Sequence, residues 1–314
     1  MKELGRLLQE DTAGDPTGRR GLWTGKRLRQ LSAELGQLGI TVSPNTVRRL
    51  LDQLGYALHA NAKTLSPCSE YRDEQFGRIA GQKKRFLARG MPMISVDTKK
   101  KELVGNFKNA GRVWSQKAVP VNDHDFRSQG LGMANPYGIY DLTANQGSVF
   151  VGTTHDTPLF AAENVARWWR YSGSKHYPDA SQLLILADSG GSNGARVRAW
   201  KYGLQRLVVD RFGLEVTVCH FPTGASKWNP IEHRLFSEIS KHWAGCPLDS
   251  YDTILDLIQG TTTQTGLQVR SYLVNKEYPT GQKISHQQMQ QVSLLKHPVL
   301  PQWNYTLRPN QNRN

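Results

Sequence analysis

Cysteine is scarce in this 314-residue chain, and the three that occur, Cys68, Cys219 and Cys246, are widely separated. They are too few for a disulfide framework or a cysteine-rich zinc site. Long hydrophobic runs are also missing, since the longest wholly aliphatic stretch, Leu183 to Ala187, is far too short to cross a bilayer. Residues 1–10 lack the apolar centre of a signal peptide. These absences predict a reduced, cytoplasmic protein without a membrane partner.

Acidic residues are few relative to basic ones: 26 Asp and Glu stand against 40 Lys and Arg, a formal net charge of +14. The excess is uneven, because residues 71–130 hold 13 basic and 6 acidic side chains, whereas residues 131–250 hold 11 and 10. Hydrophobic residues make up 38% of the chain, which is globular composition. A basic globular protein attracts polyanions, so nucleic acid is the favoured partner, although a merely solvated basic surface has the same composition.

Near the N-terminus, residues 24–36 carry leucines at helical spacing, which predicts a first helix. Ser43 is placed as an N-cap and Pro44 as the first residue of a second helix, which Gly55 ends. Two short helices joined by a glycine-containing turn are typical of helix-turn-helix DNA-binding domains. The predicted DNA contacts at the start of the second helix are Asn45, Thr46, Arg48 and Arg49. The alternative is an ordinary helical hairpin with solvated arginines.

A linker and a basic helix follow. Residues 61–71 contain Pro67 and show no periodicity, which predicts a linker. Residues 73–89 combine apolar positions at helical spacing, including Phe86 and Leu87, with a strongly cationic polar face. The candidate DNA contacts on this helix are Lys83, Lys84 and Arg85. A solvated surface helix explains the same pattern equally well.

Five later segments read as strands, at residues 93–97, 138–142, 148–153, 183–188 and 214–221. The first three are expected to pair antiparallel. The last two should join them in parallel, because predicted helices beginning at residues 158 and 195 precede each of them. Crossover helices cover both faces of such a sheet. The predicted fold class is therefore α/β, with a mixed five-stranded sheet and flanking helices, preceded by a small all-α helix-turn-helix domain.

Three acidic residues occupy special places in this arrangement. Asp97 and Asp188 each end a predicted strand, and Glu232 is the third residue of a helix for which Asn229 is the predicted N-cap and Pro230 the first residue. Taken singly, each acid has a simpler explanation as a turn or helix cap. Taken together, two strand-end carboxylates and a third on the inward face of a helix would form an all-oxygen site suited to Mg²⁺ or Mn²⁺.

Such a site has a definite chemistry. Two cations about 3.5–4 Å apart can activate an attacking oxygen and stabilise the leaving oxygen in a displacement at phosphorus. Their charge also lets carboxylates lie against a phosphodiester that would otherwise repel them. No competing zinc motif exists, because there is no His-Glu-x-x-His and the nine histidines are dispersed.

At these residues the chain resembles bacterial DDE transposases of the ISAzo insertion-sequence family, also called Rhodopirellula-type transposases. The matching stretches cover nearly the whole chain in order. They are Gly14-Asp15-Pro16, Val42-Ser43-Pro44-Asn45-Thr46-Val47, Ser95-Val96-Asp97-Thr98-Lys99-Lys100-Lys101-Glu102, Val104-Gly105-Asn106-Phe107-Lys108-Asn109, Tyr137-Gly138-Ile139-Tyr140-Asp141, Ala187-Asp188-Ser189-Gly190-Gly191-Ser192-Asn193, Trp228-Asn229-Pro230-Ile231-Glu232-His233-Arg234-Leu235-Phe236 and Trp303-Asn304-Tyr305-Thr306.

The resemblance implies an RNase H-like catalytic domain, two metal ions and an acidic triad of Asp97, Asp188 and Glu232. It also implies action on the double-stranded DNA of element ends and target, a homo-oligomer on that DNA, and a bacterial, nucleoid-associated location. Further DNA contacts are expected at Lys99, Lys100, Lys101 and Lys108. Family members usually carry additional helical DNA-binding sequence before their Gly-Asp-Pro element, so the chain is expected to be an N-terminally truncated or decayed copy, or one with a different start.

The expected domain organisation has four parts. Residues 1–60 form the helix-turn-helix region, 61–92 the linker and basic helix, 93–250 the RNase H-like catalytic domain, and 251–314 a C-terminal extension that packs on it. The leading hypothesis is a DNA transposase that cuts element ends and joins them to target DNA. The alternatives are a non-catalytic DNA-binding protein or relic of a mobile element, and an RNase H-like nuclease that cuts without joining.

Overall fold

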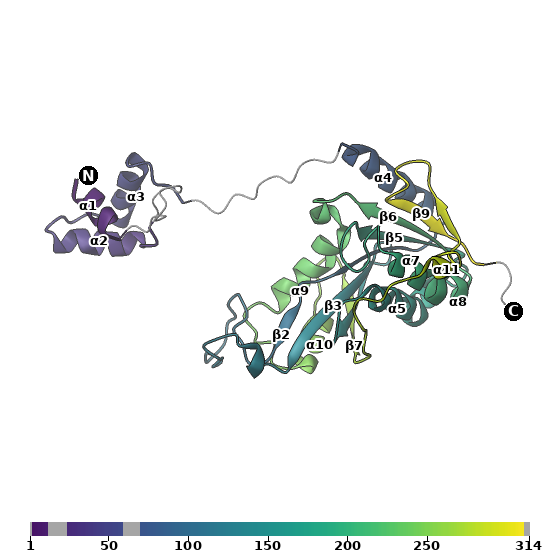
Figure 1. Cartoon of the computed structure of the whole chain (residues 1–314). Coiled ribbons are helices and arrows are strands. Elements are labelled where there is room, and N and C mark those ends of the chain that lie inside the picture. The colour runs from purple at the N-terminus through teal and green to yellow at the C-terminus, as the bar shows by residue number, and fades with distance from the viewer. Residues whose placement is uncertain (1, 12–23, 59–69, 311–314) are drawn as a thin grey trace. The chain divides into compact units, whose positions relative to one another are not determined.

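The computed structural model of the chain describes residues 2–11, 24–58 and 70–310 (Figure 1). The chain forms two compact units, Met1–Leu65 and Ser66–Asn314. The Gly14-Asp15-Pro16 element and residues 61–69 of the predicted linker lie outside the described residues. Within the described ranges, no helix combines the length and the apolar character that a membrane span requires.

In the N-terminal unit, residues 2–11 and 24–58 form three helices, α1 (Lys2–Asp11), α2 (Leu28–Gln37) and α3 (Pro44–Gln53). Its small core consists of leucines from α1 and α2 packed around the fully buried Val47 of α3. The Ser43 side chain accepts a hydrogen bond from the Thr46 N–H at 3.2 Å, so the predicted start of the second helix is confirmed. The first predicted helix begins four residues later than expected, at Leu28. The DNA-binding role of this helix pair stays a prediction.

The basic helix is α4 (Arg72–Ala88), which opens the larger unit. Its inner face buries Ile79 and Phe86 against the central strands, together with the amide side chains of Gln75 and Gln82. Leu87, one of the apolar positions of the predicted amphipathic pattern, lies away from this face and is 61% exposed. Consecutive helical residues point about 100° apart, so only one of Phe86 and Leu87 can face the sheet.

The described residues of the larger unit form a nine-stranded sheet of spatial order β7-β4-β3-β1-β5-β6-β9-β8, with β2 paired to β3 beside this path. The strands are β1 (Met93–Thr98), β2 (Glu102–Val104), β3 (Gly132–Asp141), β4 (Gln146–Gly152), β5 (Gln182–Asp188), β6 (Glu215–Phe221), β7 (Gln268–Val274), β8 (Leu294–Lys296) and β9 (Asn304–Leu307). The five predicted strands form its centre: β1, β3 and β4 pair antiparallel, and β5 and β6 join β1 in parallel. The predicted α/β fold class with a mixed sheet and flanking helices is confirmed, and the sheet is larger than five strands.

Strand β3 begins at Gly132, six residues before its predicted start at Gly138. Pro136 lies within the added segment, and proline disfavours a central strand because it lacks an N–H group. Here the Pro136 carbonyl accepts a hydrogen bond from the Lys99 N–H at 2.9 Å, and Pro136 pairs in register with Val151. The strand therefore continues through Pro136, because the carbonyl group, which is the only backbone hydrogen-bonding group of a proline, has a partner.

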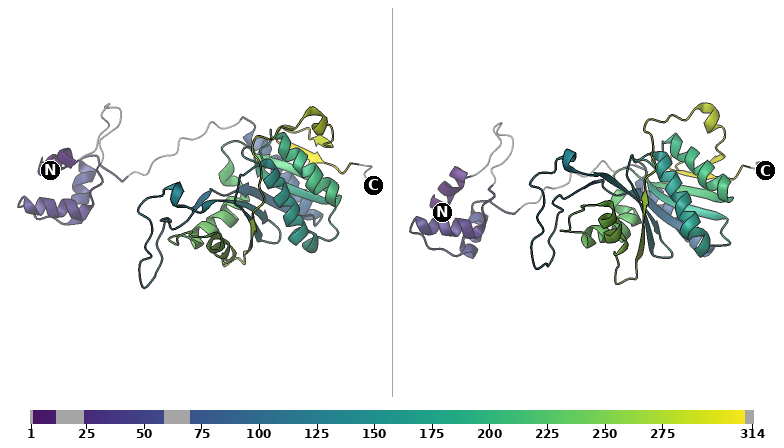
Figure 2. Two further views of the ribbon diagram at one scale, coloured as in Figure 1. Left: turned by 60° about the horizontal axis from the view of Figure 1, so that its bottom comes forward. Right: turned by 90° about the horizontal axis from the view of Figure 1, so that it is seen from below.

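Helices cover both faces of the sheet (Figure 2). Residues alternate along β5, so that Leu183 and Ile185 face one core, and Leu184 and Leu186 face another. On the first face lie α5 (Pro158–Trp168), η2 (Trp169–Gly173), α6 (Ser174–His176), α7 (Arg198–Leu204), η3 (Gln205–Val209) and α8 (Asp210–Phe212). On the other lie α4, η5 (Glu232–Phe236), α9 (Ser237–His242) and α10 (Tyr251–Gln259). Shorter helical turns are η1 (Arg127–Gln129), η4 (Ser226–Trp228) and α11 (His286–Met289).

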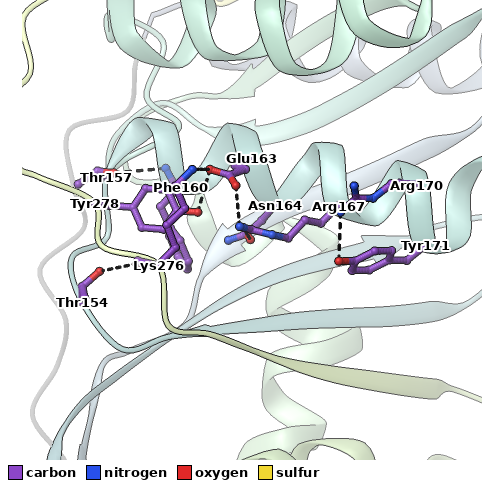
Figure 3. A network of polar contacts seen from close by, with 10 residues as sticks. All are labelled: Thr154, Thr157, Phe160, Glu163, Asn164, Arg167, Arg170, Tyr171, Lys276 and Tyr278. Carbon is purple, nitrogen blue, oxygen red and sulfur yellow. Dashed lines mark hydrogen bonds and ion pairs between the residues drawn. The ribbon is translucent and has the colours of Figure 1, made fainter.

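The residues after 250 add strands β7, β8 and β9 to the sheet and contact α5. Strand β7 pairs in parallel with β4, and β9 pairs with β6. Lys276 and Tyr278, which follow β7, both donate hydrogen bonds to the Glu163 carboxylate of α5, Lys276 Nζ at 2.7 Å and the Tyr278 hydroxyl at 2.9 Å (Figure 3). Glu163 also pairs with Arg167 at 2.7 Å. Burial raises the pKa of Glu163, but these hydrogen bonds and positive charges outweigh it and lower the pKa overall. The charged carboxylate therefore holds the C-terminal segment on α5.

Candidate active site

Asp97 and Asp188 stand at the ends of two neighbouring parallel strands. Val96 of β1 lies beside Ala187 of β5 in the last pair of the register, and each aspartate follows directly. The carboxyl ends of parallel strands open at one edge of a sheet, where α/β proteins place their ligands. The Asp97 carboxylate also accepts the Thr98 N–H at 2.8 Å, which orients it. The structure thus brings these two acids together.

Glu232 reaches the same edge from a helix that packs closely on β3. Gly138 is the register partner of Asp97 in β3. A Cβ at Gly138 would lie 2.5 Å from the Phe236 ring and 2.9 Å from Ile231 Cδ1, so only glycine lets the helix approach this closely. Ile231 and Phe236 flank Glu232 along the chain and are buried, whereas Glu232 itself is half-buried. The close approach therefore sets Glu232 beside the strand that carries Asp97.

The acids lie within each other's electrostatic field. Burial, followed by the charge of Asp188, raises the pKa of Asp97 to about 8, and the charge of Glu232 acts in the same direction. Burial and the charge of Asp188 likewise raise the pKa of Glu232. Carboxylates that repel one another in this way are stabilised by a nearby cation.

The donor set fits a hard divalent cation, since all three candidate ligands are carboxylates. Among residues 2–11, 24–58 and 70–310, however, no group of three or more His, Cys, Asp and Glu side chains is arranged to hold a metal ion. Repulsion between uncompensated carboxylates opposes a closed cluster. The chain therefore supplies ligands of the right chemistry at one edge of the sheet without closing the site by itself.

A fourth acid near this edge, Asp156, was not predicted from the sequence. It follows β4, which runs parallel to β1 because both pair antiparallel with β3. Its charge contributes to the raised pKa of Asp97 and to that of the buried Tyr137 hydroxyl, for which burial is the largest cause. Its Oδ1 atom is buried and has no hydrogen-bond partner in the described parts of the chain. The signal available in the sequence was an aspartate shortly after a strand that ends at the same edge.

The interpretation of Asn229 as an N-cap needs correction. Its side chain does not bond to its own helix: Asn229 Nδ2 donates to Asp188 Oδ1 at 3.2 Å, and its Oδ1 accepts from the Ser95 hydroxyl. The backbone of Asp188 is held separately, because its carbonyl accepts a hydrogen bond from His220 Nδ1 at 2.8 Å. Burial lowers the pKa of His220 to about 4, so the ring is neutral, and its Nε2 accepts from the Tyr305 hydroxyl at 3.2 Å. Both the side chain and the backbone of Asp188 are therefore anchored.

Of the four lysines expected to contact DNA near the first strand, Lys99 is the one that is buried. It is only 9% exposed, its Nζ lies 4.2 Å from the centre of the Trp243 ring, and it pairs with Glu102 at 3.4 Å. Burial lowers the pKa of Lys99, although Glu102 opposes this effect. The Lys99 ammonium group is therefore held between Trp243 and Glu102. The other three, Lys100, Lys101 and Lys108, are exposed.

A hollow of about 600 Å³ opens beside Glu232. Its lining includes Lys99, Lys100, Lys227 and His233 together with Glu232. A concave surface that combines cations with a candidate metal-binding carboxylate has the chemistry to hold a phosphodiester.

The remaining predicted DNA contacts lie on helices α3 and α4. Asn45, Arg48 and Arg49 are exposed on α3, and Thr46 is half-buried. On α4, Lys84 and Arg85 are exposed and Lys83 is half-buried. The α3 residues belong to the N-terminal unit and the α4 residues to the larger unit.

Comparison with protein families identifies the chain. The family model described as Rhodopirellula transposase DDE domain matches residues 3–309. The chain belongs to this family. The predicted function of a DNA transposase and the predicted DDE enzyme class are confirmed by this match.

A search of curated proteins finds no match to the transposase. Among solved structures it is similar to the Mos1 transposase paired-end complex with left transposon end (16% identity, 81% of this chain and 68% of that chain covered, TM-score 0.42). It is also similar to the Mos1 strand transfer complex (17% identity, 81% and 67%, TM-score 0.42). A third similar structure is the mariner Mos1 paired end complex with Mg (15% identity, 80% and 67%, TM-score 0.42).

Proposed function

We propose that this transposase cuts and joins DNA at Asp97, Asp188 and Glu232, which would hold two divalent cations, Mg²⁺ or Mn²⁺. The observation that supports the proposal is the convergence of three carboxylates from β1, β5 and η5 at one edge of the sheet, where burial and mutual repulsion raise the pKa of Asp97 to about 8. When bound, such a pair of cations stabilises charge on both the attacking and the leaving oxygen of the displacement.

The chain's own residues would have distinct tasks in this reaction. The three carboxylates provide oxygen ligands on fixed backbone elements. Lys100 and Lys227 line the hollow beside Glu232 and would hold phosphates of the scissile strand there. The exposed Lys101 and Lys108 would extend this contact along the DNA backbone.

The partners proposed for the transposase are double-stranded DNA ends and target DNA. The exposed faces of α3 and α4 would bind this DNA, with Asn45, Thr46, Arg48 and Arg49 contacting the element ends and Lys83, Lys84 and Arg85 the phosphate backbone. We further propose a homo-oligomer that holds two ends together, acting on the nucleoid in the bacterial cytoplasm.

Replacement of Glu232 tests the proposal, with replacement of a nearby glutamate as the control. Glu232→Gln removes one ligand charge with little change in shape, so Mg²⁺-dependent cleavage of labelled duplexes taken from either flank of the coding region should fall by about 10³-fold. Glu238→Gln is the matched control, because Glu238 lies on α9, the continuation of η5, and its carboxylate pairs with Lys241 at 2.7 Å. Cleavage is measured in Mg²⁺ and in EDTA. Equal cleavage by both variants would remove Glu232 from the reaction.

A further inference from the structure

We infer that Asn229 and Ser95 are positioning residues that hold the three acid-bearing elements in a fixed relation to one another. The inference rests on the proposed function, because it concerns how the transposase prearranges its carboxylates for metal binding. Both side chains are fully buried, with 0% exposure. A buried amide and a buried hydroxyl are costly unless their hydrogen bonds are made, so their partners identify their role.

Three hydrogen bonds form one continuous chain. The Ile231 N–H donates to Ser95 Oγ at 3.2 Å, the Ser95 hydroxyl donates to Asn229 Oδ1, and Asn229 Nδ2 donates to Asp188 Oδ1 at 3.2 Å. Ser95 lies on β1 two residues before Asp97, and Ile231 directly precedes Glu232. One hydroxyl and one amide therefore connect the strand of Asp97, the carboxylate of Asp188 and the helix of Glu232.

The direction of each hydrogen bond follows from the chemistry of the groups. A carboxylate accepts only, so the amide NH₂ group must face Asp188, and the amide oxygen is left for Ser95. The serine hydroxyl has one hydrogen, which it gives to Asn229, and it can then accept the Ile231 N–H. Pro230 has no N–H to offer, so Ile231 provides the donor that Ser95 takes. None of these three hydrogen bonds can reverse its donor and acceptor without leaving a buried polar group unpaired.

This geometry gives Asn229 a role that a helix cap would not have. The Asn229 NH₂ group orients the Asp188 carboxylate without competing for it as a cation would. Residues that orient metal ligands in this way affect metal affinity, and their loss typically weakens binding or activity by about 10–100-fold. Asn229→Leu, which is similar in size and cannot hydrogen-bond, should therefore weaken binding of Mn²⁺ by about 10–100-fold.

The test measures metal binding directly, without cleavage. The metal-free full chain is titrated with Mn²⁺ alone and free Mn²⁺ is followed by electron paramagnetic resonance, with circular dichroism to verify folding. Ser95→Ala removes the anchor of Asn229 and should weaken binding in the same direction but less, and it carries the test if Asn229→Leu does not fold. The matched control is Gln205→Leu: Gln205 is also fully buried and donates to a carboxylate, Asp210 Oδ1, at 2.7 Å, remote from the acids. Its Mn²⁺ affinity should equal that of the wild type.

Asp188→Asn separates the inference from the proposed function. If Asp188→Asn weakens Mn²⁺ binding while Asn229→Leu and Ser95→Ala retain wild-type affinity, the inference is overturned and the proposed metal site stands. If wild type and Asp188→Asn bind Mn²⁺ equally, both are overturned. Weakened binding in Asn229→Leu and Ser95→Ala, with unchanged binding in Gln205→Leu, supports the inference.

Discussion

Asp97→Asn and Asp188→Asn are each expected to lower the rate of DNA cleavage by about 10³-fold or more, and the double variant should be no slower than either single variant. The reason is that the carboxylates act together as one metal site. Loss of one ligand already disables this site, so loss of the second ligand has no further effect on the rate. Single-turnover cleavage of an end-labelled duplex in Mg²⁺ measures all three rates. Binding of the same duplex should persist in each variant, because the basic surfaces are untouched.

Independent roles for the two aspartates would give a different result. The losses would then multiply, and the double variant would be about 10⁶-fold slower, twice the single loss on a logarithmic scale. Retention of wild-type cleavage by either single variant would remove that residue from the site. Asp123→Asn is a suitable control, because the Asp123 side chain is 89% exposed on a surface loop.

The same Asp97→Asn substitution should stabilise the metal-free transposase at alkaline pH. Burial and the charge of Asp188 raise the pKa of Asp97 to about 8 in the fold, whereas an unfolded aspartate titrates near 3.8. Between these values the folded chain binds a proton that the unfolded chain releases, so the free energy of unfolding falls as the pH rises through this window. Asparagine avoids this loss. In EDTA at pH 8.5 the melting temperature of the variant should exceed that of the wild type by at least about 3 °C.

Two further melts make this prediction specific. At pH 4.5 the wild-type side chain keeps its proton in the fold, so the difference between wild type and variant should shrink. Mg²⁺ should raise the melting temperature of the wild type by binding the folded state, and should do so less for Asp97→Asn. A melting-temperature difference that is the same at pH 4.5 and pH 8.5 would mean that Asp97 is not held in this repulsive, buried environment.

Much of the fold could be predicted because it depends on local sequence. The apolar run before Asp188 and the short apolar run before Asp97 are recognisable from a few residues each, and the acids lie at the carboxyl ends of β5 and β1. The inward face of the Glu232 helix was also readable, since Phe236 and Ile239 recur at helical spacing and are buried. Local pattern and tertiary structure agree at these positions, so the amino-acid sequence alone is enough to select the candidate acids.

Other features depend on contacts between distant residues and left no local signal. Lys99 is buried because Trp243, far along the chain, offers its ring face to the ammonium group. Asn229 has the sequence position of a helix cap, and only the packing of η5 against β1 brings Ser95 to it. Strand β7 is separated by more than a hundred residues from β4, its partner in the sheet. Pairing at such separation is set by tertiary packing.

Joining of DNA ends is the measurement that tests the central claim most directly. Duplexes that carry a free 3′-hydroxyl at the flank of the coding region are incubated with the full chain, Mg²⁺ and a supercoiled target plasmid, and the products are sequenced across the junctions. We predict recombinant molecules in which that 3′-hydroxyl is linked to target DNA, formed by the wild type and absent with Asp188→Asn. Cleaved plasmid without any joined strands, at the same level in both proteins, would contradict the assignment of a DDE transposase centre to Asp97, Asp188 and Glu232.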